Sequence, residues 1–222
     1  MQSSTLLSGI RAICADFDGT IADTRLDFDL MRQRVRQFAA QEGLDGQHFV
    51  ERYVLELVAE IEDRLQPGSR SAARFRRRCE AMMSDMELAA VRGGRLFSGA
   101  GEALAELSES GRRVAVVTRN CRRAVEEFRG RHPFECHAVV TRDDVRRVKP
   151  DPEHLWQALR LLGVPSEEAA MIGDHPTDMQ CGRAAGMVAV GVLTSRSRAE
   201  ALTEAGAELV IPSLAHLPQH LP

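Results

Sequence analysis

Lysine is nearly absent from this chain. Lysine and arginine together number 29 among 222 residues, and Lys149 is the single lysine. Arginine carries a planar fork of donors, whereas lysine is a compact point charge on a flexible stem, so the two are not interchangeable at a crowded site. Lys149 therefore either meets a chemical need that arginine cannot meet or stands there by chance in an arginine-biased sequence, and composition leaves both open.

Other absences argue against several classes of protein. The net charge is -3, so the chain lacks the basic surface typical of nucleic-acid binding. No apolar run approaches the roughly 20 residues of a membrane span, and the first ten residues lack the basic start and apolar stretch of a signal peptide. The five cysteines form no C-x-x-C pair. A disulfide framework or a zinc site is therefore not expected, and reduced thiols in a cytoplasmic protein are.

Residues 24–92 have the pattern of an inserted helical domain. Apolar side chains at 30, 31, 35, 38 and 39 recur at the spacing of one helix face. The stretch 49–65 repeats this spacing, and Pro67-Gly68 ends it. Ser69 or Ser71 caps a third helix that runs to about residue 90. No strand pattern interrupts these residues, so they are expected to form a helical bundle.

The remaining residues, 1–23 and 93–222, alternate between strands and helices. Short, β-branched apolar runs predict strands at 11–17, 113–118, 137–141, 169–174, 188–193 and 207–211. Helical patterns separate the last five. This alternation predicts an α/β, Rossmann-like core: a parallel sheet with helices on both faces, into which the helical domain is inserted after the first strand.

Unusual polar residues follow four of the predicted strands or open the next helix. They are Asp16 and Asp18 in D-F-D-G-T, Thr118 and Asn120 in V-V-T-R-N, Lys149 in V-K-P-D-P, and Asp174 and Asp178 in G-D-H-P-T-D. Each group also has a plain interpretation, as a turn, a helix cap or a solvated loop. In a parallel sheet, however, the carboxyl ends of the strands form the site. We therefore expect these groups to lie at one edge.

So many carboxylates at one edge repel one another, which disfavours their ionisation. A bound divalent cation relieves the repulsion. All-oxygen ligands indicate a hard ion, and the small number of protein ligands indicates Mg²⁺ that keeps several waters. The sequence therefore predicts a magnesium site.

Taken together and in this order, D-F-D-G-T, T-R-N, K-P and G-D-H-P-T-D resemble the four motifs of the haloacid-dehalogenase-like hydrolase superfamily. The helical insertion lies where that superfamily carries its α-helical cap domain. The ending A-G-A-E-L-V-I-P-S-L-A-H-L is similar to that of the phosphoglycolate phosphatase-like subgroup. The resemblance implies a Mg²⁺-dependent phosphomonoester hydrolase that acts on a small phosphorylated metabolite.

For the opening motif, the resemblance implies that Asp16 is the nucleophile that takes up the phosphoryl group as an aspartyl-phosphate. It implies that Asp18 is the acid/base, which protonates the leaving oxygen and later activates water. The chemistry accounts for the spacing. A carboxylate nucleophile splits one hard displacement into two easier ones, and residues i and i+2 of an extended chain share a face.

The resemblance also implies the metal ligands. Mg²⁺ would be held by Asp16, by the backbone carbonyl of Asp18 and by Asp174. Asp178 would help through water or from outside the ligand sphere.

The phosphate would be bound by residues from three motifs. Thr118 and Asn120 would donate hydrogen bonds to it, and Lys149 would supply a point charge. Gly19 would let the backbone turn close to the phosphate, and Thr20 would order Asp18.

Three features depart from the pattern or lie beyond it. Arg119 stands where relatives often have a small or polar residue, and it either faces away, as we favour, or reaches a second anionic group of the substrate. His175 either binds metal or, as we favour, has an outer or solvent role. The run R-F-R-R-R at 74–78 either reads an anionic substrate or forms a solvated face, and we favour the solvated face.

Other activities on this fold stay open. A phosphosugar mutase such as β-phosphoglucomutase would share the core chemistry, and pyrophosphate is another possible substrate. A non-catalytic binding protein is disfavoured by the complete motif set, and dehalogenation by Asp18. We expect a monomer or homodimer with no nucleic-acid or membrane partner.

Overall fold

The computed structural model describes residues 6–45, 49, 53–195 and 197–222 of the chain. Two sequence features fall partly outside these residues. They are the first five residues, part of the stretch in which we expect no signal peptide, and residues 50–52, near the beginning of the second predicted helix.

The chain divides into two compact units, Met1–Thr24 with Gly93–Pro222, and Arg25–Arg92. We call them the core unit and the helical unit, and each is described by itself. Among the described residues, none of the helices has the length and apolar character that crossing a membrane requires.

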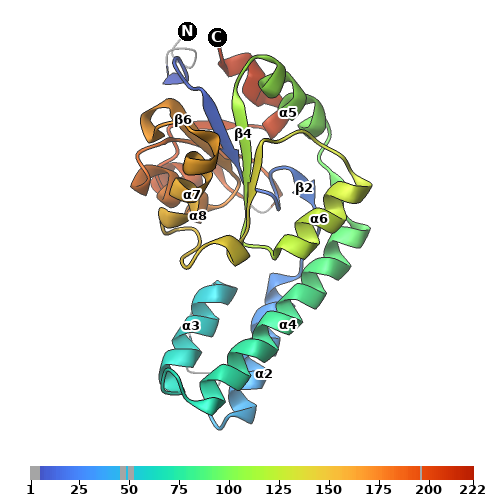
Figure 1. The fold of residues 1–222 in the computed structure, drawn as a ribbon, viewed down its shortest axis with the longest axis vertical. Helices are drawn as coiled ribbons and strands as arrows, with labels where there is room; N and C mark the ends of the chain where they lie inside the picture. Colours follow the sequence, from blue (N-terminus) through green and yellow to red (C-terminus); the bar gives the residue numbers. More distant parts are fainter. Residues whose placement is uncertain (1–5, 46–48, 50–52, 196) are drawn as a thin grey trace. The chain divides into compact units, whose positions relative to one another are not determined.

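The core unit is built on a six-stranded sheet in the order β5-β4-β1-β6-β7-β8, and every neighbouring pair is parallel (Figure 1). Its strands are β1 Ala12–Ala15, β4 Arg113–Val117, β5 Ala138–Val140, β6 Ala169–Gly173, β7 Val188–Val192 and β8 Leu209–Ile211. A separate antiparallel pair joins β2 Ala22–Asp23 to β3 Arg95–Leu96. The helices are α5 Ala100–Glu109, α6 Arg122–Arg131, α7 Glu153–Leu162, α8 Pro176–Ala184 and α9 Ala199–Glu204, with 3-10 helices η2 Arg142–Asp144, η3 Ser166–Glu168 and η4 Leu214–His220.

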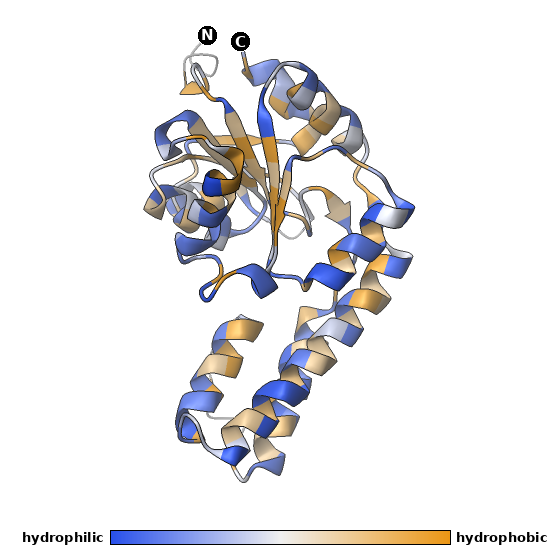
Figure 2. Cartoon of the chain, viewed as in Figure 1, coloured by the Kyte–Doolittle hydropathy of each residue, from blue (hydrophilic) through white to orange (hydrophobic). Residues whose placement is uncertain are grey.

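Both faces of this sheet are buried. Successive residues of a strand point to opposite faces, and all four residues of β1 are fully buried. Leu155 of α7 and Cys181 of α8 share one apolar cluster with Cys14 and Met171 of the sheet. The helix α5 packs on β4 from the other side (Figure 1). Parallel sheets covered in this way consist of nearly continuous apolar runs, as the colouring of the strands in Figure 2 shows. The predicted α/β, Rossmann-like fold is confirmed.

The helical unit consists of α2 Phe28–Gln41, α3 Val54–Arg64 and α4, which runs Arg70–Gly93. The α2 helix buries every fourth residue, Met31, Val35 and Ala39, against the other helices. The hydroxyl of Ser69 accepts a hydrogen bond from the backbone N–H of Ala72 at 3.1 Å, so Ser69, one of the two predicted caps, begins α4.

The predicted start of the second helix differs from the structure. The α3 helix begins at Val54 and not near Phe49, because Tyr53 has extended backbone angles and forms its N-cap.

Candidate active site

Three neighbouring strands bring the motif residues to one edge of the sheet. The β1 strand lies between β4 and β6, and parallel neighbours end at the same edge. Asp16 follows β1, Thr118 follows β4 and Asp174 follows β6. The backbone N–H of Asp16 donates to Ile172 O at 2.8 Å, and that of Thr118 donates to Val140 O at 3.0 Å. Both residues therefore still pair with the neighbouring strand at the point where their own strand ends.

Lys149 lies at the centre of this edge and is 1% exposed. Its Nζ is 2.7 Å from Oδ1 of Asp16 and 2.7 Å from Oδ1 of Asp178. Burial lowers the pKa of Lys149, but the two carboxylates outweigh burial and raise it, so the ammonium keeps its charge. The backbone N–H of Lys149 donates to Nδ1 of the buried His154 at 3.2 Å. Burial and then the Lys149 charge lower the pKa of His154 to about 3, so its ring is a neutral acceptor at neutral pH.

Carboxylates gather around the same point. Oxygen atoms of Asp16, Asp174 and Asp178 lie within 4.8 Å of one another. Burial raises the pKa of Asp174 well above its ordinary value, and the charges of Asp16 and Asp178 raise it further. Burial and Asp178 also raise the pKa of Asp16, against the opposite effect of Lys149. A cluster that resists ionisation in this way is suited to a bound cation.

The two oxygens of Asp178 already have donors of their own. Oδ1 contacts Nζ of Lys149 at 2.7 Å, and Oδ2 accepts the backbone N–H of His175 at 3.1 Å. This arrangement favours the outer role for Asp178.

Two glycines provide the room for these carboxylates. A Cβ at Gly19 would lie 2.2 Å from Oδ2 of Asp174, and a Cβ at Gly173 would lie 2.2 Å from Oδ2 of Asp178. Gly19 also has a φ of +84°, which L side chains rarely adopt. Any larger residue at either position would displace a site carboxylate.

Asp18 is held by two side chains from elsewhere in the core unit. The Thr24 hydroxyl donates to its Oδ1, and Nδ2 of Asn120 donates to its Oδ2 at 2.7 Å. The expectation that Thr20 orders Asp18 is wrong, because the Thr20 hydroxyl is buried without a hydrogen-bond partner among the described residues. The backbone N–H groups of Ile21 and Ala22 both donate to Phe17 O. The chain thus turns tightly between Phe17 and Ala22. The hydroxyl that bonds Asp18 is that of Thr24, beyond this turn, and not that of Thr20.

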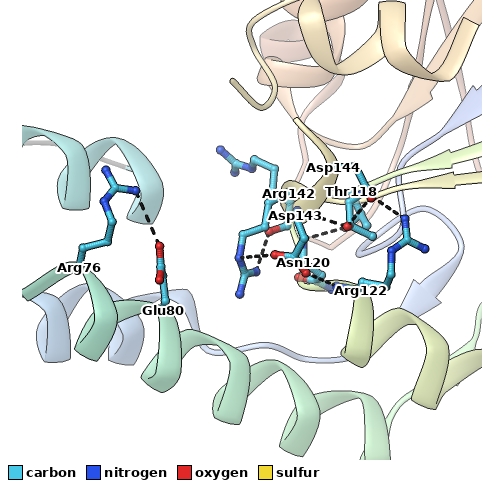
Figure 3. A network of polar contacts seen from close by, with 10 residues as sticks. Arg76, Glu80, Thr118, Asn120, Arg122, Arg142, Asp143 and Asp144 are labelled. Carbon is cyan, nitrogen blue, oxygen red and sulfur yellow. Dashed lines mark hydrogen bonds and ion pairs between the residues drawn. The ribbon is translucent and has the colours of Figure 1, made fainter. Parts of the chain in front are cut away.

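The predicted phosphate-binding segment 118–120 forms part of a network of polar contacts (Figure 3). Thr118 and Asn120 are 1% and 4% exposed, and the Thr118 hydroxyl accepts the backbone N–H of Asn120 at 3.1 Å. The carbonyl of Arg119 accepts a bond from Nη1 of Arg142 at 2.9 Å, and that of Asn120 accepts the Arg142 backbone N–H at 3.3 Å. The loops that follow β4 and β5 therefore brace each other.

His175 is the N-cap of helix α8, which starts at Pro176. Its Nδ1 lies 2.8 Å from the Thr177 hydroxyl and accepts the Thr177 backbone N–H at 3.3 Å. Burial and then the charge of Arg119 lower the pKa of His175 to about 4. Nδ1 of His175 is thus occupied in capping α8, which favours a role for His175 outside the metal ligands. The effect on its pKa shows that the charge of Arg119 acts on His175.

The arginine run of α4 is paired within the helical unit. Nε of Arg74 donates to Glu42 at 2.9 Å, and Nε of Arg76 donates to Glu62 at 2.8 Å. Arg76 also lies 3.8 Å from Glu80 (Figure 3). These contacts favour a solvated, ion-paired face.

Sequence reasoning missed two hydroxyls, those of Thr24 and Thr194. The Thr194 hydroxyl, two residues beyond β7, donates to Oδ2 of Asp174 at 3.3 Å. Its position at a carboxyl strand end was the available signal, but a lone threonine without a neighbouring charge did not stand out.

Comparison with known proteins adds to this geometry. The family model described as "Haloacid dehalogenase-like hydrolase" matches residues 13–192, which include all four motifs. The chain belongs to this family. The predicted superfamily is thereby confirmed.

Relatives of this haloacid dehalogenase-like hydrolase carry several names. "Pyrophosphatase PpaX" of Bacillus cereus (strain AH820) is 42% identical over 87 residues, which are 38% of this chain and 40% of that protein. A crystal structure of CbbY from Rhodobacter sphaeroides in complex with phosphate matches with a TM-score of 0.64 and 26% identity, over 94% of this chain and 96% of CbbY. The alignment to PpaX thus spans about two fifths of that relative's length.

A third match concerns the fold alone. The crystal structure of a "predicted phosphoglycolate phosphatase" from Haemophilus somnus has a TM-score of 0.67 and 15% identity, over 95% of this chain and 97% of that one.

The side chains of this hydrolase fit a hard divalent cation. The candidate ligand atoms of Asp16, Asp174 and Asp178 are all carboxylate oxygens, the donors that Mg²⁺ prefers. Lys149 neutralises part of the cluster through its contacts with Asp16 and Asp178. A cation beside Asp174 would offset the remaining repulsion.

Proposed function

We propose that this protein is a Mg²⁺-dependent phosphomonoester hydrolase of the phosphoglycolate phosphatase-like type, acting on a small phosphorylated metabolite. The observation that carries the proposal is the buried contact of Lys149 Nζ with Asp16 and Asp178, at 2.7 Å each. A buried ion pair is weak support for stability alone. This ion pair lies where the carboxyl ends of β1, β4 and β6 meet, which is where a parallel sheet forms its site, so we assign it a role in catalysis.

Asp16 is the proposed nucleophile. Lys149 holds Oδ1 of Asp16, which directs the other carboxylate oxygen to the phosphorus atom of the substrate. The bond from phosphorus to the leaving oxygen breaks as the bond to Asp16 forms, and water then releases inorganic phosphate from the aspartyl-phosphate. Lys149 also lies where negative charge develops on the transferring phosphoryl group.

Asp18 is the proposed acid and base. The hydrogen bonds from Thr24 and Asn120 fix both of its oxygens, so its carboxyl group keeps one orientation. In that orientation it would give a proton to the leaving oxygen and later take one from water, as an acid/base group within hydrogen-bond reach can.

Asp16 and Asp174, with the Asp18 carbonyl, would hold Mg²⁺, which supplies positive charge to the phosphoryl oxygens when bound. Asp178 would keep Lys149 in place beside them. Thr118 and Asn120 would line the phosphate position from the loop after β4.

Pyrophosphate is the second candidate substrate. The relative named Pyrophosphatase PpaX favours it, through an alignment of 87 residues at 42% identity. Attack by Asp16 on a phosphoanhydride would use the same residues, and the leaving group would be phosphate instead of an alkoxide.

A panel assay tests the proposal. Release of inorganic phosphate is measured with Mg²⁺ for phosphoglycolate, several sugar phosphates and pyrophosphate, with and without EDTA. We expect one small ester to be preferred and EDTA to abolish the activity. Preference for pyrophosphate would favour the second candidate. An isomerised sugar phosphate without phosphate release would indicate a mutase, and full activity after exhaustive dialysis in EDTA would contradict the metal requirement.

A further inference from the structure

A threonine outside the four motifs reaches the metal-site carboxylate. Thr194 lies beyond the end of β7, which neighbours β6 in the sheet. Its Oγ1 donates to Oδ2 of Asp174 at 3.3 Å. A hydrogen bond to a charged acceptor is stronger than one between neutral groups, and this one meets the carboxylate from a strand that none of the motifs includes.

The position of this hydroxyl is fixed by its own turn. The backbone N–H of Thr194 donates to Oγ of Ser197 at 2.7 Å, and the backbone N–H of Ser197 donates to Oγ1 of Thr194 at 3.2 Å. Oγ of Ser197 in turn donates to Val192 O at 3.0 Å. The two hydroxyl oxygens lie 3.2 Å apart. Oγ of Ser197 and Oδ2 of Asp174 are both acceptors within reach of the Thr194 hydroxyl hydrogen, and the carboxylate is the stronger acceptor of the two.

A second loop also approaches Asp174. A Cβ at Gly19 would lie 2.2 Å from Oδ2 of Asp174, so the backbone of the loop after β1 closely approaches the same oxygen that Thr194 contacts. The loop after β1 and the loop after β7 therefore both restrict the Asp174 carboxylate. Asp16 and Asp178 repel its charge, and a donor from Thr194 opposes that repulsion.

We propose that Thr194 is a positioning residue, which orients Asp174 toward the divalent cation. The inference rests on the metal site of the proposed function. Hydrogen-bond partners of metal ligands typically change metal affinity by about 10- to 100-fold when they are removed. The 3.3 Å contact is longer than a usual O–H···O bond, so the expected effect lies at the lower end of that range.

Direct metal binding is the test, with Mn²⁺ as the probe and electron paramagnetic resonance of free Mn²⁺ as the readout. The full chain is compared with Thr194→Val, which keeps the shape and removes the hydroxyl, and with Thr194→Ser, which keeps the hydroxyl. Thr203→Val is the matched control, because the Thr203 hydroxyl donates to Ala199 O within α9, at an exposed position. Circular dichroism checks that each variant is folded.

We expect Thr194→Val to raise the Kd for Mn²⁺ by about 10-fold, while Thr194→Ser and Thr203→Val stay within about 2-fold of wild type. In assays, Thr194→Val should need more Mg²⁺ for half-maximal activity yet approach the wild-type kcat at saturating Mg²⁺. A loss of structure alone would not raise the Mg²⁺ requirement while leaving kcat unchanged, and it would not be reversed in Thr194→Ser.

Three results would overturn the inference: an unchanged Kd in folded Thr194→Val, an equal loss in Thr194→Ser, or a wild type that binds no Mn²⁺. Binding requires no substrate. A protein that shows the expected ranking for Mn²⁺ and hydrolyses none of the panel compounds would contradict only the proposed function.

Discussion

The two units of this chain use charge in different ways. In the core unit, Lys149 lies buried between the carboxylates of Asp16 and Asp178. In the helical unit, arginines of α4 lie on the surface, and the contact between Arg76 and Glu80, both exposed, is representative. One region gathers buried charges around a single cation, and the other distributes exposed charges in separate pairs.

The difference shows which charges call for a functional explanation. Exposed ion pairs contribute about 0–1 kcal/mol and are common on helix surfaces. Breaking a buried pair costs about 3–5 kcal/mol, although an apolar replacement of the whole pair is often neutral or stabilising. Stability alone therefore does not account for Lys149 and its partners. A set of buried charges at strand ends indicates chemistry, whereas the arginine run of α4 needs no substrate to explain it.

The nucleophile gives the sharpest contrast between the units. Asp16→Asn keeps the shape but provides a carboxamide that cannot accept a phosphoryl group. Activity on the best ester of the panel should fall by about 10⁴-fold or more. Glu42→Gln makes the same chemical change in the helical unit and should leave kcat near wild type. Retention of a tenth of the wild-type turnover by Asp16→Asn would exclude Asp16 as the nucleophile.

The next prediction concerns Lys149 as a lysine. Lys149→Met keeps much of the stem but leaves Asp16 and Asp178 without their cation. We expect kcat/KM at saturating Mg²⁺ to fall by at least about 10²-fold and the free energy of unfolding to fall by about 3–5 kcal/mol. Arg76→Met removes an exposed pair in the helical unit and should cost less than about 1 kcal/mol. Chemical denaturation and steady-state kinetics measure both.

Lys149→Arg distinguishes charge from shape. Its planar head is larger than an ammonium, so it should crowd the phosphate and the metal and recover only part of the activity. Full recovery by arginine would mean that lysine stands here by chance. Full activity in Lys149→Met would place Lys149 outside the site.

Two glycines with nearly the same backbone geometry provide a third comparison. Gly19 has a φ of +84° and Gly43, in the helical unit, has +85°. Alanine at either position carries the strain of a left-handed residue, about 1–2 kcal/mol. Only at Gly19 would the added Cβ meet Asp174, since nothing lies within 4 Å at Gly43.

Gly19→Ala should therefore lower kcat/KM by about 10- to 100-fold, because small displacements of catalytic groups have effects of this size. Gly43→Ala should share the loss of thermal stability and keep its activity. Equal activities in the two variants would show that the space beside Gly19 has no part in the reaction.

The smallest expected effect is a difference in pH dependence. The pKa of Asp174 is raised by burial and then by Asp16 and Asp178. Its contribution to metal-free stability is therefore full below the ordinary carboxyl pKa of 3.8 and is lost as pH rises through the raised pKa. Glu42 behaves in the opposite way. Hydrogen bonds from Arg74 and Ser71 lower its pKa from 4.5 to about 2, so its contribution is present above 4.5 and is lost as pH falls toward 2.

Melting temperatures of the metal-free protein between pH 3 and pH 8 measure both effects. Asp174→Asn should flatten the decline toward neutral pH, and Glu42→Gln should flatten the decline toward acid. Mg²⁺ at pH 8 should raise the Tm of wild type more than that of Asp174→Asn. Parallel curves for wild type and Asp174→Asn would contradict the account of the carboxylate cluster.

Much of the fold was predictable because buried parallel strands have a strong local pattern. The apolar run at β1 and the alternation after residue 93 identified the six-stranded core. The pair β2–β3 was missed, since strands of two residues have no periodicity. The start of α3 was misplaced because apolar spacing continues across Tyr53, whose backbone is extended.

The candidate site was predictable where charge marks it. Asp16 and Asp174 are charged residues that directly follow apolar strands, and Lys149 is marked as the single lysine of the chain. Thr24 and Thr194 carry no such mark, because a hydroxyl that bonds a distant carboxylate depends on how loops return in space. The family resemblance assigned Thr20 to Asp18, whereas the backbone turn at Phe17–Ala22 is followed by Thr24, whose hydroxyl is the one that reaches Asp18.

The strand order has a consequence for synthesis on the ribosome. The β1 strand is central in the sheet, but its register partner in β4 lies about 100 residues later, and its partner in β6 lies later still. At about 5–20 residues per second, the first of these partners is made roughly 5–20 s after β1. During that interval both edges of an apolar strand are unpaired, which favours association with other chains. Meanwhile the residues of α2, α3 and α4 are complete and can pack with one another. The strand that leads into Asp16 is thus made before both of its neighbours in the sheet and waits longest for its partners.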